Sequence, residues 1–226
     1  MRISALFLSL ILFNFSVGAA ETQPQADEKL SYAIGVLFGR NMALDVDVNT
    51  DAFLQGVRDV LTDAKLKYTP EEMQQVVNSF REQQLKTQQQ AGQANVAAGQ
   101  AFLDANAKKP GITVLPSGLQ YRVIKAGTGP KPKGTDTVVV HYRGTLIDGK
   151  EFDSSYSRGE PTPLRLDGVI KGWQEAVTLM PVGSKWEIFL PPALAYGERG
   201  AGNMIGPNTS LIFEIELQEI KAAKAQ

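Results

Sequence analysis

The chain offers few side chains for proton transfer or metal binding. His141 is the only histidine among 226 residues, so a Ser-His-Asp triad or a histidine-ligated metal would have to use it. It lies in an alternating run, Val-Val-Val-His-Tyr-Arg (138–143), whose odd and even positions face opposite sides of a strand. His141 therefore shares a face with Val139 and Arg143, and Tyr142 lies on the other face. We interpret His141 as a structural strand residue rather than a catalytic one.

Three carboxylates cluster in the sequence without forming a recognisable site. Asp148, Glu151 and Asp153 match no calcium-loop spacing. Asp148 followed by Gly149 instead predicts a tight turn between two strands. We expect Glu151 to be solvated, which leaves Asp153 as the carboxylate of interest. The chain contains no cysteine, which excludes disulfides, thiolate metal sites and a thiol nucleophile.

A glycine-rich stretch follows Tyr196, with glycines at positions 197, 200, 202 and 206. It lacks the lysine and the strand-to-helix context of a phosphate-binding loop, so we expect a flexible flap there. The remaining candidates are aromatic and aliphatic residues with very few polar groups among them. Such a set suits a reaction that needs no proton transfer.

Five motifs in the C-terminal half carry these apolar residues. They are Val-Val-Val-His-Tyr-Arg-Gly (138–144), Asp-Gly-Lys-Glu-Phe-Asp-Ser-Ser (148–155), Val-Ile-Lys-Gly-Trp (169–173), Leu-Ala-Tyr-Gly (194–197) and Ser-Leu-Ile-Phe-Glu-Ile-Glu-Leu (210–217). In this order, over about the last half of the chain, they resemble the FKBP-type peptidyl-prolyl cis/trans isomerases. The resemblance implies catalysed rotation about X-Pro bonds, with no cofactor and no metal ion.

Prolyl rotation suits an apolar site. Its barrier of about 18–20 kcal/mol arises from amide resonance, and the uncatalysed exchange takes tens to hundreds of seconds. Twisting the bond removes the charge separation of the planar amide, so a dry apolar pocket favours the twisted state over the ground state. A large acceleration is therefore available without a nucleophile.

The resemblance assigns roles to individual residues. It implies that Trp173 forms the floor of an apolar bowl, with walls from Tyr142, Phe152, Val169, Ile170 and Phe213. Asp153 and Tyr196 match the polar rim of the family, with the Tyr196 hydroxyl offered to a substrate carbonyl. The backbone N–H of Ile170 is the expected second donor. Met204 and Ile205 match the flap that closes over a ligand.

Three positions depart from the commonest family pattern. Leu164 stands at a wall position where many members carry phenylalanine, Ala176 replaces a glycine, and Gly206 replaces the first proline of the flap. Activity is expected to survive all three. Macrolide-type inhibitors are expected to bind, with an affinity that these departures alter, and Gly206 suggests a looser flap.

The elements that must position this site indicate an α+β fold. Alternating β-rich runs occur at Leu119–Ile124, Thr137–Leu146, Lys185–Leu190 and Leu211–Ile220. Val169–Leu179 is the only helix expected in this half. We predict a C-terminal isomerase domain, residues 110–226, with an FKBP-like twisted antiparallel sheet wrapped on that short helix.

Helical patterns precede this domain. Apolar residues recur at helical spacing at Leu30, Ile34, Leu37, Phe38 and Met42, and again at Phe53, Val57, Val60 and Leu61 after a cap at Asn49 or Thr50. The sharpest helix start is Thr69-Pro70-Glu71-Glu72, a capping box with proline at the first helical position. One helix of about 38 residues could follow, because the next proline is Pro110, although Gly92 and Gly99 would weaken it. Its polar middle predicts a bridge between domains.

The N-terminal half carries a second resemblance. Residues 30–42 and 53–60 look like the helical module that precedes the isomerase domain in the exported, macrophage-infectivity-potentiator-like subgroup. That module typically dimerises, so the resemblance implies a homodimer. We predict a helical dimerisation module at 21–69 and a long connecting helix at 70–109.

The first twenty residues and the overall charge indicate where the chain acts. Arg2, an apolar run at 5–15 and small residues at 17–20 predict a signal peptide at 1–20. The resemblance implies the periplasm of a Gram-negative bacterium, with outer-membrane association or secretion as alternatives. The formal net charge of −1 provides no basic field for nucleic acid, so no nucleic-acid partner is expected.

The expected partners are unfolded or partly folded polypeptides that contain proline, with chaperone activity alongside isomerisation. Two other functions stay open at this point. One is a holdase or binding module whose bowl no longer catalyses. The other is a hydrolase that uses His141 with Ser154 or Ser155.

Overall fold

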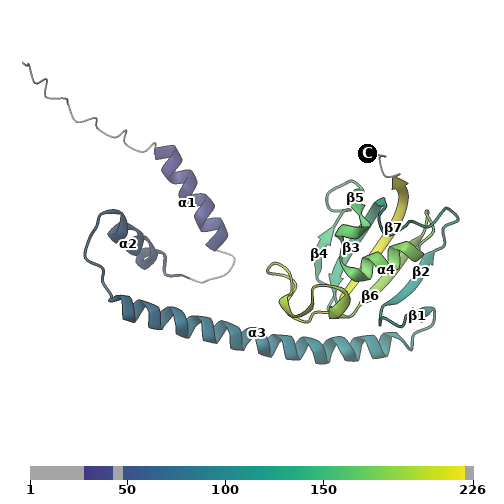
Figure 1. Cartoon of the computed structure of the whole chain (residues 1–226), viewed down its shortest axis with the longest axis horizontal. Coiled ribbons are helices and arrows are strands. Elements are labelled where there is room, and N and C mark those ends of the chain that lie inside the picture. The colour runs from purple at the N-terminus through teal and green to yellow at the C-terminus, as the bar shows by residue number, and fades with distance from the viewer. Residues whose placement is uncertain (1–27, 43–47, 222–226) are drawn as a thin grey trace, which may run out of the picture. The chain divides into compact units, whose positions relative to one another are not determined.

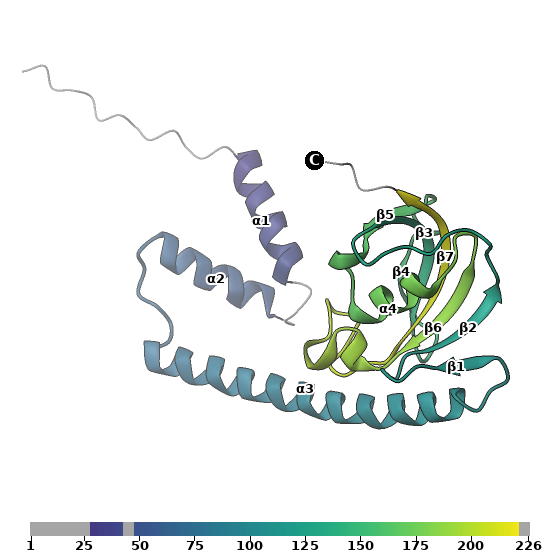
Figure 2. The ribbon, with the colours of Figure 1, turned by 45° about the vertical axis from the view of Figure 1, so that its right-hand side comes forward.

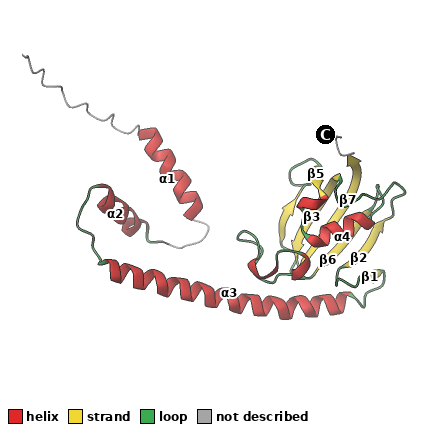
Figure 3. Cartoon of the chain, in the orientation of Figure 1, coloured by secondary structure: helices red, strands yellow, loops and turns green. Residues whose placement is uncertain are grey.

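The computed structural model describes residues 28–42 and 48–221, whose helices and strands are drawn in Figures 1 and 3. The chain divides into two compact units between Asn49 and Thr50. The predicted signal peptide, residues 1–20, lies outside the described residues. No helix within the described ranges is both long enough and apolar enough to cross a lipid bilayer.

Helix α1 (Glu28–Met42) is the described element of the first unit. Its predicted apolar stripe forms a largely uncovered surface. Leu30, Ile34, Leu37 and Phe38 are between 52% and 62% exposed.

The second unit opens with α2 (Thr50–Leu61) and α3 (Pro70–Asn106). The predicted capping box at the start of α3 is confirmed. The Thr69 hydroxyl accepts from the Glu72 N–H at 3.2 Å, and the Glu72 carboxylate accepts from the Thr69 N–H at 2.8 Å. The helix runs without interruption for 37 residues, so Gly92 and Gly99 do not break it.

Helix α2 and the first half of α3 also expose their apolar residues. The exposed side chains include Val57, Val60, Leu61, Met73, Val76, Val77 and Phe80. Every residue from Pro70 to Ala91 is solvent-exposed. These helices therefore carry apolar surface that the described part of the chain does not bury.

The remainder of the second unit is built on a seven-stranded antiparallel sheet (Figures 1 and 2). Its strands are β1 (Ile112–Val114), β2 (Gln120–Lys125), β3 (Thr137–Leu146), β4 (Glu151–Ser154), β5 (Thr162–Arg165), β6 (Lys185–Leu190) and β7 (Leu211–Lys221). The order is β1-β2-β6-β7-β3-β4, with β5 paired to β3. The predicted α+β class and the four predicted strands are confirmed.

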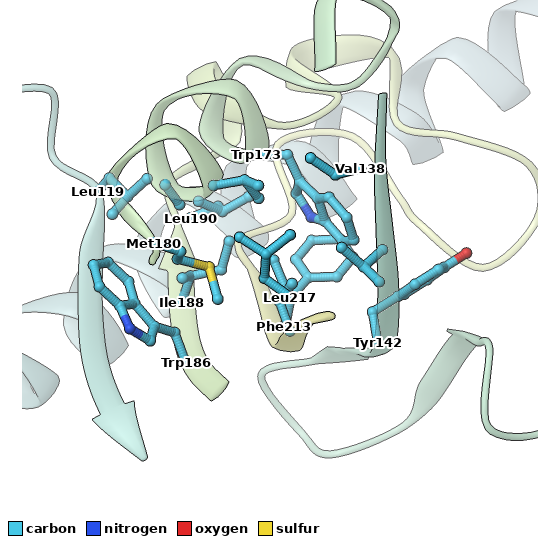
Figure 4. Close-up of a cluster of buried hydrophobic side chains, with 14 of the residues drawn as sticks. Leu119, Val138, Tyr142, Trp173, Met180, Trp186, Ile188, Leu190, Phe213 and Leu217 are labelled. Carbon is cyan, nitrogen blue, oxygen red and sulfur yellow. The ribbon is translucent and has the colours of Figure 1, made fainter. Parts of the chain in front are cut away.

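The main core lies between the sheet and the short helix α4 (Lys171–Leu179). Alternate residues of β3 and β7 face it, among them Val138, Val140, Ile215 and Leu217, all fully buried. Figure 4 shows side chains of this cluster, with Trp173 at one side of it and Trp186 at the other. The predicted alternation of β3 is confirmed, because Tyr142 faces the core and His141 is only half-buried on the other face.

The last part of α3 packs against the sheet unit, which the polar sequence did not predict. Its covered residues, Gly92, Gly99, Leu103 and Asn106, recur at i, i+7, i+11 and i+14, so they share one face of the helix. Asn106 Nδ2 donates to Gln120 Oε1 at 3.0 Å, and Gln120 Nε2 donates to the Leu103 carbonyl at 2.9 Å. A helix expected only to bridge domains is thus anchored by its C-terminal third. The predicted domain limits at residues 69 and 109 stay predictions.

Candidate active site

A cavity of about 280 Å³ opens at one end of the core. It is lined by Tyr142, Phe152, Asp153, Leu164, Gly168, Val169, Ile170, Trp173, Tyr196 and Phe213. All of the predicted site residues except Met204 and Ile205 therefore meet in this space, which we call the Trp173 cavity. Gly168 lines the cavity as well and was not predicted.

Trp173 lines the cavity and is only 3% exposed; its predicted place at the floor stays a prediction. Its ring stands edge-to-face against Tyr142, with centroids 5.2 Å apart and an interplanar angle of 89°. It meets Phe213 in the same way, at 5.3 Å and 88°. Figure 4 shows these three rings drawn together from α4, β3 and β7. The indole is therefore packed against neighbours on two paired strands.

The start of α4 joins the base of the cavity to its wall. The Ile170 carbonyl caps the helix by accepting from the N–H groups of Trp173 at 3.0 Å and Gln174 at 3.1 Å. Gln174 Nε2 also donates to the Val169 carbonyl at 2.7 Å. No hydrogen bond among the described residues uses the Ile170 N–H, which agrees with its predicted role as a donor to a ligand.

Gly144 makes room for the aromatic wall. A Cβ at this position would lie 2.6 Å from Phe152 Cζ and 2.8 Å from Phe213 Cε1, too close for any side chain. The space lets Phe152 and Phe213 meet edge-to-face at 5.5 Å. Sequence reasoning gave Gly144 no role, although a glycine inside a strand is a recognised sign of close approach by another group.

The rim of the cavity is an ion pair built on Asp153. The Tyr142 hydroxyl donates to Asp153 Oδ2 at 2.5 Å, and Arg158 Nη1 donates to Asp153 Oδ1 at 2.6 Å. Arg158 Nη2 also donates to the Tyr142 hydroxyl at 2.8 Å, and its guanidinium lies 5.4 Å from the centre of that ring. The Tyr142 hydroxyl points away from the buried cluster, toward this network (Figure 4).

Arg158 is a rim residue that sequence reasoning missed. It follows Asp153 by only five residues, and an arginine so close in sequence to the carboxylate of interest was the available signal for an ion pair. Arg158 holds Asp153 and Tyr142 in one geometry, so neither Asp153 oxygen is left without a donor.

The same contacts determine the charge state of the rim. Burial by itself raises the pKa of Asp153, but hydrogen bonds from Tyr142 and Arg158 outweigh it and hold the pKa below the usual value of 3.8. Burial, followed by the hydrogen bond to Asp153, raises the pKa of Tyr142 above 10.0. Asp153 is therefore an anion and Tyr142 a neutral phenol at any pH near neutrality.

Tyr196 completes the polar side of the cavity and is 39% exposed. Burial and then the negative charge of Asp153 raise the pKa of its phenol. Its hydroxyl has no hydrogen-bond partner among the described residues. Its predicted role as a donor to a substrate carbonyl stays a prediction.

Met204 and Ile205 lie outside the Trp173 cavity. Ile205 is 7% exposed and belongs to the hydrophobic core. Met204 lines a second cavity of about 230 Å³ together with Asn95 and Asp148. Their predicted role as a flap over the ligand stays a prediction.

His141 and Ser155 are close together, but they form a support for the strands rather than a nucleophile and base. His141 Nδ1 lies 2.9 Å from Ser155 Oγ. Ser155 is fully buried, and its hydroxyl accepts from the Tyr142 N–H at 2.7 Å and donates to the Tyr142 carbonyl at 3.2 Å. A substrate could not reach this hydroxyl, which argues against the hydrolase reading. In the ranges 28–42 and 48–221 no cluster of His, Asp or Glu side chains could hold a metal ion.

Comparison with known proteins matches both halves of the chain. A family model described as "FKBP-type peptidyl-prolyl cis-trans isomerase" matches residues 129–218. A second model, "Domain amino terminal to FKBP-type peptidyl-prolyl isomerase", matches residues 27–123.

Similar proteins cover nearly the whole chain. "Outer membrane protein MIP" of Legionella longbeachae is 47% identical, over 87% of this chain and 86% of that protein. "Peptidyl-prolyl cis-trans isomerase Mip" of Coxiella burnetii is 42% identical, over 95% and 96% respectively. The crystal structure of FkpA from Escherichia coli superposes with a TM-score of 0.62 at 38% identity, covering 88% of this chain and 98% of that one.

The charge states of the rim predict how activity in the Trp173 cavity depends on pH. Because the pKa of Asp153 is lowered and those of Tyr142 and Tyr196 are raised, none of the three titrates between about pH 5.5 and 9. The stabilising contribution of the Asp153 network is lost only as the pH falls through the lowered pKa of that carboxyl. Isomerase activity measured by protease-free NMR exchange should therefore be flat across this range. A bell-shaped profile with limbs near neutrality would contradict this account.

Proposed function

The chain belongs to the FKBP-type peptidyl-prolyl cis-trans isomerases, and we propose that the Trp173 cavity is where it rotates X-Pro bonds. The observation that carries the proposal is the cavity itself, which is lined mainly by aromatic and aliphatic side chains, with Asp153 as its one charged lining residue. The prolyl ring lies on the Trp173 indole, between the Tyr142 and Phe213 rings. Tyr196 and the Ile170 N–H hold the flanking carbonyls.

The Trp173 cavity favours the twisted amide because its lining is mostly apolar. A planar amide is stabilised by charge separation between nitrogen and oxygen, and water solvates that separation. Inside an apolar cup the planar form loses this solvation, whereas the twisted form has less charge to solvate. No proton is transferred, which agrees with a rim whose groups do not titrate near neutrality.

Asp153 acts in this proposal as a positioning group. Both of its oxygens accept hydrogen bonds, from Tyr142 and Arg158, so it is neither a free general base nor a nucleophile. Its ion pair instead fixes the Tyr142 ring against Trp173. The cup thereby keeps its shape while the substrate rotates, which is the preorganisation that catalysis requires.

Removing one polar group of the rim at a time tests whether that group contributes to isomerase activity. Tyr196→Phe deletes a single hydroxyl donor, and Asp153→Ala removes the group that orients Tyr142. Each is expected to lower kcat/KM by about five- to tenfold, the effect of losing one hydrogen bond that acts in the transition state. Protease-free NMR exchange on a proline peptide gives the rate, and circular dichroism verifies the fold.

Asp136→Ala is the matched control for Asp153→Ala, because Asp136 bonds the Lys133 N–H within its turn and does not line the Trp173 cavity. It should keep the wild-type rate. Wild-type rates in both rim variants would refute the proposed site. A chain that suppressed aggregation of a proline-independent client but left prolyl exchange unchanged would instead be a holdase.

We further propose that the chain is a homodimer joined through its N-terminal helices. Leu37 on α1 is 62% exposed, and Val57 and Val60 on α2 are 41% and 69% exposed. Each of these two helices exposes apolar side chains that the described residues do not cover, and the same helices of a second copy would cover them. The match of residues 27–123 to the amino-terminal domain model supports the proposal.

A charge placed among the exposed apolar side chains of α1 or of α2 should separate the two copies. Leu37→Asp, and separately Val57→Asp, is expected to shift the molar mass from dimer toward monomer in multi-angle light scattering, because burying an unpaired carboxylate is costly. The activity per chain on a short peptide should not change. Gln55→Asp, exposed on the side of α2 opposite Val57, is the control and should stay dimeric. A dimer that survived both substitutions would place the interface elsewhere.

The proposed clients and location follow from the same family membership. Proline-containing polypeptides that fold in the bacterial envelope are the proposed substrates, and chaperone activity is proposed alongside isomerisation. Export to the periplasm is supported by the leader pattern at 1–20 and by relatives such as the outer membrane protein of Legionella longbeachae. The size and apolar lining of the Trp173 cavity also suit macrolide-type inhibitors.

A further inference from the structure

Helix α3 is bonded to the loop that carries the rim of the cavity. Asn95 Nδ2 donates to the Pro207 carbonyl at 2.9 Å and to Thr209 Oγ1 at 3.2 Å. Both acceptors lie in the segment from Gly197 to Thr209, which we call the rim loop because it begins directly after Tyr196. Asn95 and these acceptors are separated by more than a hundred residues, so the contact depends on how α3 docks.

The rim loop is compact, so a restraint at one end reaches the other. The Asn208 N–H donates to the Gly197 carbonyl at 2.8 Å, which closes the loop beside Tyr196. Within it, Ala201 and Ile205 exchange backbone hydrogen bonds at 2.8 and 3.2 Å. A shift at Pro207 and Thr209 would therefore move Gly197, the neighbour of the rim tyrosine.

Glycines let the helix approach the loop closely. Gly92 and Gly99 flank Asn95 on the same face of α3. A Cβ at Gly99 would lie 2.5 Å from Ser210 Oγ, and one at Gly92 would lie 3.2 Å from Asn208 Nδ2. Glycine is unfavourable inside a helix relative to alanine, but at these two positions a larger residue would hold α3 away from the loop.

Gly206 makes room for the Asn95 amide on the loop side. A Cβ at this position would lie 3.3 Å from Asn95 Nδ2, which is a tight contact. The Thr209 hydroxyl, which accepts from Asn95, donates in turn to the Gly206 carbonyl at 2.8 Å. The resemblance implied a proline at position 206, but this chain has a glycine there. The side-chain amide of Asn95 on α3 instead bonds the neighbouring residues Pro207 and Thr209.

We propose that Asn95 is a positioning residue for prolyl isomerisation, which holds the rim loop against α3 and thereby fixes the Tyr196 hydroxyl over the Trp173 cavity. The inference rests on the proposed function of that cavity. It makes the C-terminal part of α3 a component of the isomerase site, whereas the sequence suggested only a connecting helix.

Asn95→Asp tests the proposal in the full chain, because aspartate keeps the shape of asparagine but cannot donate to the Pro207 carbonyl. It is expected to lower kcat/KM by about three- to tenfold and to speed hydrogen exchange at the Asn208 amide. Gln93→Glu is the matched control, since it adds the same charge at an exposed position of the same helix and should match wild type.

A double-mutant cycle separates positioning from general destabilisation. If Asn95 acts through Tyr196, Asn95→Asp should cause little further loss of kcat/KM in a Tyr196→Phe background. Losses that multiply across the two variants would overturn the proposal, as would wild-type kcat/KM in Asn95→Asp. Wild-type rates in Tyr196→Phe alone would instead count against the proposed function, and hydrogen exchange at Asn208 would still test the contact.

A second pair of variants tests the contact without changing charge. Gly99→Ala favours the helix intrinsically but places a methyl group against Ser210 Oγ, so it should lower kcat/KM. Ser210→Ala removes that oxygen, which has no hydrogen-bond partner among the described residues, and should restore activity in the double variant. Full activity in Gly99→Ala, or no rescue by Ser210→Ala, would contradict close docking of α3 as the cause.

Discussion

The edge-to-face packing of Trp173 against Tyr142 and Phe213 is the interaction on which the site depends. It joins α4 to the paired strands β3 and β7 and holds the indole where it lines the cavity. Aromatic pairs in this geometry contribute about 0.5–1.5 kcal/mol beyond the area they bury, and their angles restrict sliding. The position of the Phe213 ring also requires glycine at position 144, because only glycine leaves space there for the Phe152 and Phe213 rings.

Polar groups are arranged around this packing without adding acid-base chemistry. Arg158 and Asp153 neutralise each other at the edge of the Tyr142 ring, and Ser155 fixes the backbone of Tyr142 from the opposite side. The cup therefore presents an apolar base and a few neutral donors. That composition suits a reaction in which a bond rotates, because the transition state is less polar than the ground state.

The sequence predicted what hydropathy and local spacing encode. The alternation of β3 and the strands around the cavity followed from periodicity, the helix start followed from the capping box at Thr69, and the family resemblance implied which aromatic residues meet. It could not predict contacts made by small or polar residues over long separations. Asn95 and the Pro207 carbonyl are far apart in sequence, and the face of α3 that docks is marked by Gly92 and Gly99 rather than by apolar side chains. Burial of Ile205 also depends on how the rim loop folds back, which periodicity does not show.

The most direct test is to observe Trp173 while a substrate binds. The chain has two tryptophans, and Trp186 stacks on Tyr121 at 4.3 Å and does not line the Trp173 cavity, so its indole N–H resonance is an internal control. On titration with a short peptide containing one X-Pro bond, the Trp173 indole resonance should shift saturably and show nuclear Overhauser contacts to the prolyl ring, while Trp186 stays constant. An unchanged Trp173 resonance under conditions where cis and trans peptide exchange faster would contradict the account.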